Sequence, residues 1–383
     1  MASEDTFTRP DDETILNTAP THQESNPHLQ SSKRGVEPTQ KAAPNTKAFT
    51  CATFPRIVLP IRDLLGNIAD TQRIAIEESP NRFLAILPFG AGMDYNTDAA
   101  NRNAEAEMED LIRGLGFDNT GLDVVKAVPK YPPKRKYEKP WIYILEGGSP
   151  ALRQFLEWQQ TFSFETRTFS VIPFDPNTES WVITNICGSI VTEDQTALKT
   201  ILLTIKKTLW ENPEFRRVTN KCFAEAGIEG SVSERVFKAT TSYTLSFIEC
   251  NDSNGNRDPI LQLMGEPIAT NPNDHQEYLT IIRKVKFWKG IRPFESTKRA
   301  VNCAWCKADT HPGHSCPFAR VQGWLGPKPQ AILDNPQNDH RGGGMERRPS
   351  SQRGRGGRGR SHGQSSSRGP GGHGRRPSST LYA

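Results

Sequence analysis

The sequence predicts an α+β fold, in which an ordered middle lies between two polar, disordered ends. Short apolar runs such as 82–88 and alternating runs such as 181–186 are typical of strands. Apolar residues recur at helical spacing from Leu198 to Leu209, which predicts an amphipathic helix. The 30 glycines and 29 prolines concentrate toward the ends of the chain, where too little apolar surface exists to offset the entropy of ordering.

The first 128 residues divide into two parts. Residues 1–48 are rich in Pro, Thr, Ser, Asn and Gln and poor in apolar residues, so we expect a disordered head. Residues 49–128 are expected to form a small α/β domain, with a buried strand over 82–88 and a helix over 104–113.

A basic, proline-containing linker over 129–139 follows this domain. The simplest interpretation is a solvated connection between two domains. The same residues also fit a segment that contacts a nucleic-acid backbone, or a nuclear-import signal around Lys134, Arg135 and Lys136.

Residues 140–273 are expected to form a second α+β domain with the element order β-α-β-β-α-(α)-β. Ser149 can cap its first helix, with Pro150 at the first helical position, where the missing N–H is not needed. The expected strands are 141–145, 168–172, 181–186 and 240–250, and the expected helices begin near Ser149, Thr192 and Glu214.

This element order resembles the split β-α-β arrangement of RNA-recognition-motif domains, whose four-stranded sheet stacks bases. Ile142, Tyr143 and Ile144 are similar to the aromatic-bearing first strand of that family. The resemblance implies an RRM-like sheet over 140–273. Two roles remain open for this sheet, because aromatic residues of a sheet serve either as an RNA platform or as ordinary core.

Residues 274–300 are expected to form a basic helix followed by a linker. Inward-facing apolar residues predict a helix from Asp274 to Trp288. Its end and exit are strongly basic, which fits either a solvated helix end or a phosphate-contacting surface. The apolar face comprises Tyr278, Leu279, Ile282, Val285 and Trp288, and the basic residues are Arg283, Lys284, Lys286, Lys289, Arg292, Lys298 and Arg299.

The most specific motif lies over 301–320, where four residues follow the pattern C-x2-C-x4-H-x4-C. These residues are Cys303, Cys306, His311 and Cys316. Three thiolates and one imidazole suit one structural zinc ion in a closed tetrahedral site. His314 is a rival to His311 as the fourth ligand. The alternative interpretation is that these are reduced cysteines without a metal.

Aromatic and basic residues around the motif are candidates for nucleic-acid contacts. Three thiolates and one Zn²⁺ sum to a net negative charge, so attraction for phosphates must come from flanking cations. The aromatic residues could stack on unpaired bases, or could cover the metal site instead. The candidate cations are Lys298, Arg299, Lys307 and Arg320, and the candidate stacking residues are Trp305, Phe318 and Trp324.

The chain is expected to end in a linker over 321–340 and a disordered Arg-Gly-rich tail over 341–383. The tail holds ten arginines and one glutamate, which leaves residues 1–340 mildly acidic. Glycine keeps such a tail unfolded, while Arg353, Arg355, Arg358 and Arg360 can pair with phosphates and stack on bases. A tail that serves only solubility is the alternative.

Several classes of protein are disfavoured by what the sequence lacks. It contains none of the common hydrolase, nucleotide-binding or metalloprotease motifs, so we expect no enzyme activity and no small-molecule substrate. It contains no apolar run long enough for a transmembrane helix, and its acidic N-terminus does not fit a signal peptide. We therefore expect no membrane partner and a location in the cytoplasm, the nucleus or both.

The spacing of the four ligands resembles the zinc knuckle of retroviral nucleocapsid and Gag-like proteins. Members of that group typically carry glycine at the positions of Lys307 and Thr310. The whole arrangement resembles Gag-like proteins of the first reading frame of non-LTR (LINE-type) retrotransposons, fungal type. This resemblance implies a structural protein that coats its own RNA and acts as a nucleic-acid chaperone. The partners we consider are single-stranded RNA or DNA and further copies of the chain. The alternative is a cellular RNA-processing adaptor whose knuckle docks a protein partner.

Overall fold

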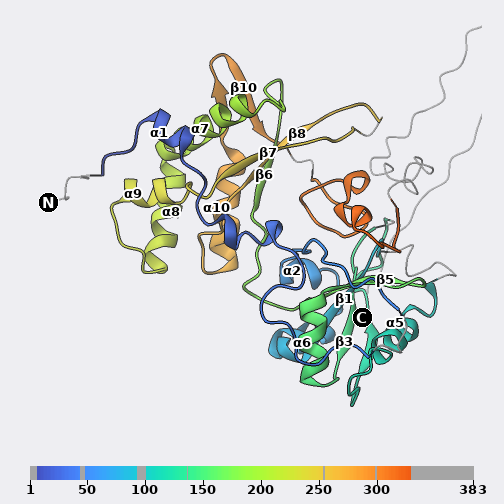
Figure 1. Cartoon of the computed structure of the whole chain (residues 1–383). Coiled ribbons are helices and arrows are strands. Elements are labelled where there is room, and N and C mark those ends of the chain that lie inside the picture. The colour runs from blue at the N-terminus through green and yellow to red at the C-terminus, as the bar shows by residue number, and fades with distance from the viewer. Residues whose placement is uncertain are drawn as a thin grey trace, which may run out of the picture. The chain divides into compact units, whose positions relative to one another are not determined.

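A computed structural model describes residues 7–43, 48–92, 101–135, 137–252, 255–297 and 300–328 (Figure 1). Helices are mixed with two five-stranded sheets in which every pair of neighbouring strands is antiparallel. The expected α+β class is therefore confirmed. No helix among the described residues is long and apolar enough to cross a membrane.

The first sheet is built around a fully buried central strand and has the strand order β2-β3-β1-β5-β4. The central strand β1 is apolar on both faces, because both faces of the sheet are covered. The bounds are β1 Phe83–Pro88, β2 Asp123–Lys126, β3 Tyr143–Glu146, β4 Thr161–Ser163 and β5 Thr168–Pro173.

The two faces of β1 belong to two different cores, since successive side chains of a strand point to opposite faces. Leu84 and Ile86 lie in a core with helices α5 (Ala104–Arg113) and α6 (Pro150–Gln159). Ala85 and Leu87 face a second core, formed with residues from two distant regions, 54–76 and 303–324. The shorter helices on that side are α2 Ile61–Leu64, α3 Asp70–Glu78 and the 3-10 helix η3 Pro80–Arg82.

The second sheet has the strand order β7-β8-β6-β10-β9 and shares a third core with four helices. The expected apolar stripe from Leu198 to Leu209 is confirmed, because it forms the buried side of α7. The strands are β6 Val182–Cys187, β7 Thr244–Ile248, β8 Ile260–Met264, β9 Lys286–Lys289 and β10 Arg292–Ser296. The helices are α7 Gln195–Glu211, α8 Pro213–Glu225, α9 Val232–Lys238 and α10 Pro272–Lys284.

The structure divides the strands differently from the expected domains. Strands β3, β4 and β5 follow the expected linker 129–139, yet they pair with β1 and β2 in one sheet. The RRM-like sheet expected over 140–273 is therefore not formed. An apolar pattern identifies a strand but not the partner with which it pairs, and this explains the error.

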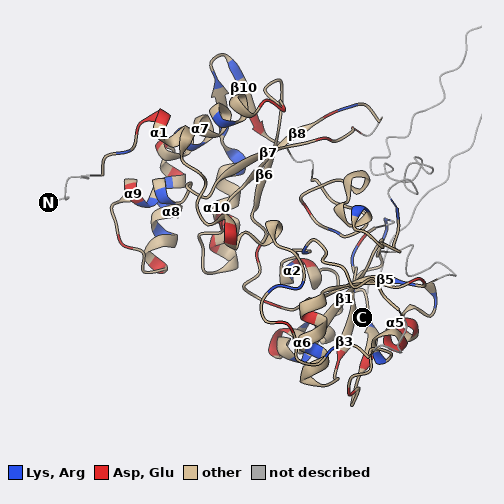
Figure 2. Ribbon diagram, viewed as in Figure 1, with Lys and Arg blue, Asp and Glu red and all other residues tan. Residues whose placement is uncertain are grey.

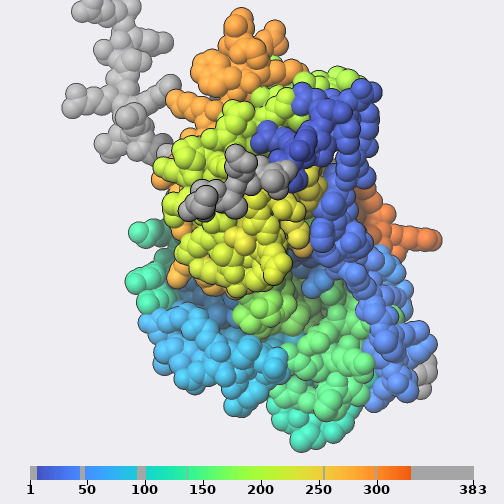
Figure 3. All heavy atoms as spheres, turned by 90° about the vertical axis from the view of Figure 1, so that its left-hand side faces the viewer, coloured from blue at the N-terminus to red at the C-terminus, as the bar shows by residue number. Residues whose placement is uncertain are grey.

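The head is ordered over residues 7–43, whereas the expectation for 1–48 was disorder. It contains α1 (Asp12–Asn17) and the 3-10 helices η1 (Gln23–Ser25) and η2 (Pro27–Leu29). Figure 3 shows this segment, in blue, running along the surface of the molecule. Backbone hydrogen bonds hold it there, from Thr21 to Thr241 at 3.1 Å and from Lys33 to Trp158 at 2.7 Å. Hydrogen bonds to distant parts of the chain thus fix a segment that has little apolar content of its own.

The expected helix 274–288 is too long at its C-terminal end. Helix α10 ends at Lys284, and residues 286–296 form the β9–β10 hairpin instead of a basic helix end and linker. Phe287 and Trp288 favour a strand, because aromatic side chains fit a pleated surface. Residues 329–383, with most of the expected linker and the whole Arg-Gly tail, lie outside the described residues.

Candidate metal centre

Two tight turns bring the four cysteine and histidine side chains of the motif together. The N–H of Lys307 donates to the carbonyl of Cys303, and the N–H of Cys303 donates to the carbonyl of Ala308, both at 2.9 Å. Cys316 lies between the 3-10 helices η5 (Gly313–Ser315) and η6 (Pro317–Arg320). The four ligand atoms of Cys303, Cys306, His311 and Cys316 lie within 4.8 Å of one another, so the cluster can hold one metal ion.

His311 supplies the fourth ligand atom and His314 does not. The Nε2 atom of His311 lies 3.4 Å from the sulfur of Cys306, while Nδ1 lies 3.1 Å from the hydroxyl of Thr310. A hydrogen bond to the second ring nitrogen orients a ligand imidazole, and Thr310 is placed to provide it. His314 is exposed and is not part of the cluster.

The three thiols interact strongly with one another. All three are buried, with Cys306 fully inaccessible. Hydrogen bonds from Cys306 and Cys316 lower the pKa of Cys303 well below its ordinary value. Burial raises the pKa of Cys306, and the hydrogen bond with Cys303 raises that of Cys316 to about 12. Without a metal, one thiol of the cluster therefore loses its proton easily, whereas the other two resist deprotonation because the negative charges would repel one another. A bound cation would relieve this repulsion.

The metal centre is part of a main hydrophobic core and is not a separate small module. Phe318 and Trp324 both lie 4.8 Å from Phe89, measured between ring centroids, and Phe318 also stacks on Phe54 at 6.1 Å. Phe318 is 1% exposed and Trp324 is 8% exposed. The expectation that these two rings stack on bases is therefore corrected, because neither offers a free face.

A close approach of two backbones fixes the centre against the end of β1. The N–H of Gly90 donates to the carbonyl of Trp305 at 2.9 Å. Gly90 has a φ of +86°, and a Cβ atom there would lie 3.3 Å from the Trp305 ring. Glycine is favoured at this position for both reasons. Trp305 itself is half-buried against the core, which agrees better with a covering role than with a freely exposed ring.

Lys307 is a buried side chain and not a surface cation. Its ammonium donates to the carbonyl of Ala304 at 2.7 Å and lies 4.7 Å from the centre of the Tyr137 ring. Burial lowers the pKa of Lys307 to about 7. The residue has a φ of +65°, a left-handed conformation that costs a non-glycine residue energy. A glycine at this position would adopt the same conformation without that cost.

The remaining candidate contacts are only partly within the described residues. Arg320 is exposed beside the centre and fits the expected role of a flanking cation. Lys298 and Arg299 lie outside the described residues, as do Arg353, Arg355, Arg358 and Arg360 of the tail.

Asp309 connects the centre to two distant segments, and sequence analysis did not identify it. The Ser180 hydroxyl donates to a carboxylate oxygen of Asp309 at 2.7 Å, and the Gln262 amide donates to its carbonyl at 2.9 Å. His28 also lies 3.1 Å from Ser180, but its Nε2 atom accepts the N–H of Trp181. These hydrogen bonds link the head, the residues just before β6 and the metal centre. No local sequence signal could have revealed this link.

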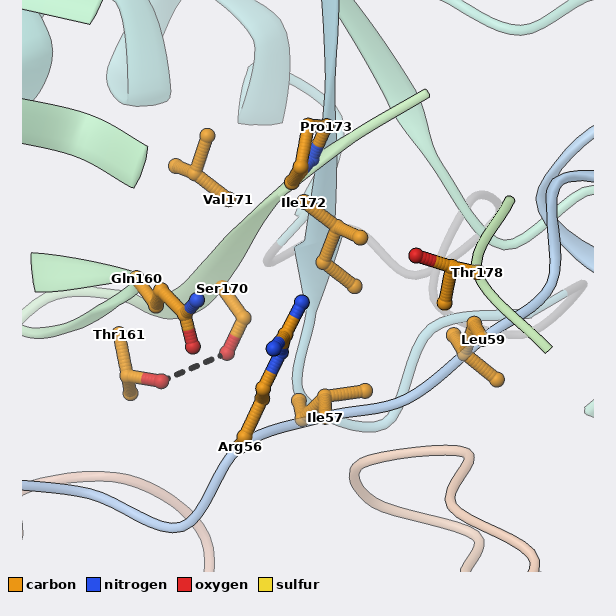
Figure 4. Close-up of a pocket in the computed structure, with 10 residues that line it drawn as sticks. All are labelled: Arg56, Ile57, Leu59, Gln160, Thr161, Ser170, Val171, Ile172, Pro173 and Thr178. Atoms are coloured by element: carbon orange, nitrogen blue, oxygen red, sulfur yellow. Dashed lines mark hydrogen bonds between the residues drawn. The ribbon is translucent and has the colours of Figure 1, made fainter. Parts of the chain in front are cut away.

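A cavity between residues 56–59 and strand β5 is too small to bind a small molecule (Figure 4). It is lined by residues that include Arg56, Thr161 and Ser170, and the last two share a hydrogen bond of 2.9 Å. Its volume of about 20 Å³ is enough for roughly one water molecule.

Comparisons with protein-family models, with curated proteins and with solved structures found no match for this chain. Its function is therefore argued from the residues and their geometry.

Proposed function

We propose that this protein binds single-stranded nucleic acid, RNA in particular, as a structural component of ribonucleoprotein assemblies, and that it requires one structural zinc ion. The observation that carries the proposal is the buried cluster of Cys303, Cys306, His311 and Cys316. Four protein ligands leave a tetrahedral ion no open position for water or substrate, which favours a structural role over a catalytic one.

Zinc is the metal that best suits this set of ligands. Thiolate and imidazole ligands in a tetrahedral arrangement are typical of structural zinc sites. The ion would stabilise the turns around Cys303 and Cys316 and, through Phe318, the core beneath them. Because the ligands are buried and the site would be negatively charged, phosphates would be attracted by exposed arginine and lysine residues and not by the metal.

The Arg-Gly-rich tail is the second element that supports this function. Ten arginines over 341–383 provide positive charge, and segments of this composition bind nucleic acid with little sequence preference. Together with the ligand spacing of the knuckle, the tail supports the resemblance to Gag-like proteins of LINE-type retrotransposons. Self-association and RNA chaperone activity are then expected properties of the assembly.

The second candidate function is an RNA-processing adaptor whose knuckle docks a protein. One observation favours it, namely that Phe318 and Trp324 are buried and so cannot form the stacking face of a nucleic-acid-binding knuckle. In that case RNA contact would belong to the tail alone. Neither candidate requires catalysis.

The test uses the full chain, its zinc content and its binding of a fluorescein-labelled single-stranded oligoribonucleotide. We expect one zinc ion per chain in the wild type and its loss in Cys306→Ser. Replacing Arg353, Arg355, Arg358 and Arg360 by serine should reduce the slope of log K against log salt by about 3, at roughly 0.7 per phosphate contact. Replacement of the same residues by lysine is the matched control, which should keep the slope.

The outcomes separate the two candidates. Large particles of protein and RNA favour the structural role. A discrete one-to-one complex with another protein, lost on mutation of the knuckle surface, favours the adaptor. If the wild type binds no single-stranded nucleic acid at low salt, the proposed function is wrong.

A further inference from the structure

The β9–β10 hairpin lies at the edge of the second sheet. Lys289 pairs with Arg292, so only Gly290 and Ile291 form the turn. Gly290 has a φ of +61° while Ile291 is not left-handed, which is the pattern of a type II′ turn. Such a turn matches the twist of the strands and fixes their register. In Figure 3 the hairpin, in orange, projects at the top of the molecule.

The register of this hairpin determines which side chains face solvent. Phe287 and Phe294 are paired across the strands, stack at 5.3 Å between ring centroids and lie in the core. Side chains alternate along a strand, so Trp288 must point to the opposite face, where its cross-strand partner is Pro293. Trp288 is consequently 56% exposed. Sequence analysis assigned Trp288 to the buried face of a helix, and the strand reverses that assignment.

Basic residues lie on both faces of the hairpin. Lys286 shares the face of Trp288 with its cross-strand partner Glu295, whereas Lys289 and Arg292 pair with each other on the opposite face, next to the turn. Lys284, Lys286 and Arg292 are exposed and Lys289 is half-exposed, whereas Glu295 is the one acidic residue of the hairpin. Within the described part of the chain, none of these four cations forms an ion pair. Figure 2 shows the blue of Lys and Arg on this hairpin. A surface with one acidic and several unpaired basic residues complements a polyanion.

We propose that the β9–β10 hairpin is a binding surface for single-stranded RNA, in which Trp288 stacks on an unpaired base beside Lys286, while Lys289 and Arg292, on the opposite face next to the turn, contact phosphates where the strand passes over the tip. This inference rests on the proposed function and adds a base-contacting site to it. A planar ring with flanking cations is the usual combination for binding single strands without sequence preference. The single apolar residue at the tip, Ile291, offers too little area to anchor a membrane.

The main test measures how full-length variants of Trp288 bind three fluorescein-labelled probes. The probes are a single-stranded oligoribonucleotide, an oligodeoxynucleotide and an abasic oligodeoxynucleotide of equal length. Trp288→Ala should weaken binding of the two base-containing probes about 5- to 100-fold and leave the abasic probe unchanged, because only stacking is lost. Trp288→Phe should keep most of the affinity, whereas Trp288→Leu, which is apolar but not planar, should not.

Two controls separate this surface from the tail and from general effects of mutation. The Trp288 variants are also made in the chain whose four tail arginines are replaced by serine, so that tail binding cannot mask the result. Val232→Ala on α9 removes another exposed apolar side chain and should have no effect. Lys289→Gln with Arg292→Gln should lower the salt slope by about 1.4, and Lys238→Gln, an exposed lysine on α9, should lower it less.

Each outcome has a defined meaning. If the wild type binds RNA and Trp288→Ala binds it equally well in both backgrounds, the hairpin proposal is wrong while the proposed function survives. If the wild type binds no single-stranded probe, both fail. If Trp288→Leu matches the wild type, or if the hairpin variants lose binding to phosphatidylserine vesicles instead of RNA, the surface serves an apolar or membrane partner and our assignment is overturned.

Discussion

Replacing Phe318 by alanine should destabilise the whole first sheet and not only the metal centre. The ring is 1% exposed and contacts the rings of Phe54, Phe89 and Trp324. A buried phenylalanine removes at least about 150 Å² from water, which at about 25 cal/mol per Å² corresponds to about 4 kcal/mol. Measured losses for such substitutions are about 3–5 kcal/mol. We therefore expect the free energy of unfolding to fall by this amount.

Urea unfolding followed by far-UV circular dichroism measures the loss, and hydrogen exchange locates it. Amides of β1 and β5 should exchange faster in Phe318→Ala, because Phe89 and Leu87 belong to the same core as Phe318. Arg320→Ala, an exposed change in the same segment, is the control and should alter stability by less than about 0.5 kcal/mol. A loss below about 1 kcal/mol, with exchange in β1 unchanged, would show that residues 301–328 fold as an independent module and would refute our description.

Two further predictions concern buried ionisable groups. Burial lowers the pKa of Lys206 on α7 to about 8, so its charged form opposes folding below that pH, and stability should rise between about pH 8 and 10.5. Lys206→Met should remove this rise and should increase the free energy of unfolding near neutral pH by as much as about 3 kcal/mol. The exposed Lys199→Met is the control and should have neither effect. Thermal unfolding measured across pH tests both variants. Burial also lowers the pKa of His275, an effect that Arg62 and Arg283 reinforce and Glu179 opposes. The unfolded state then binds more protons than the folded state, so the free energy of unfolding should fall as the pH drops below 6.5. His275→Phe should make this fall smaller. If the variant loses as much stability as the wild type below pH 6.5, His275 is not the group responsible.

The local elements of the fold were predictable because their signals are local. The stripe of α7 and the strand over 82–88 follow from the spacing of apolar residues alone. The ligand set of the metal centre was predictable for the same reason, since 14 consecutive positions contain all four ligands. The order of the head was not predictable, because its hydrogen bonds to Thr241 and Trp158 join residues far apart in the chain.

The sequence by itself determined the α+β class, most helices and strands, and the four residues that can hold a metal ion. Only the tertiary structure decided which strands share a sheet, and that the metal centre lies in the core of the first sheet. It also decided that Phe318, for which two roles were open, is buried, and that Trp288 is exposed although the sequence had predicted it on the buried face of a helix. The reason is that spacing along a chain specifies a conformation and a face, whereas burial depends on which distant residues cover that face.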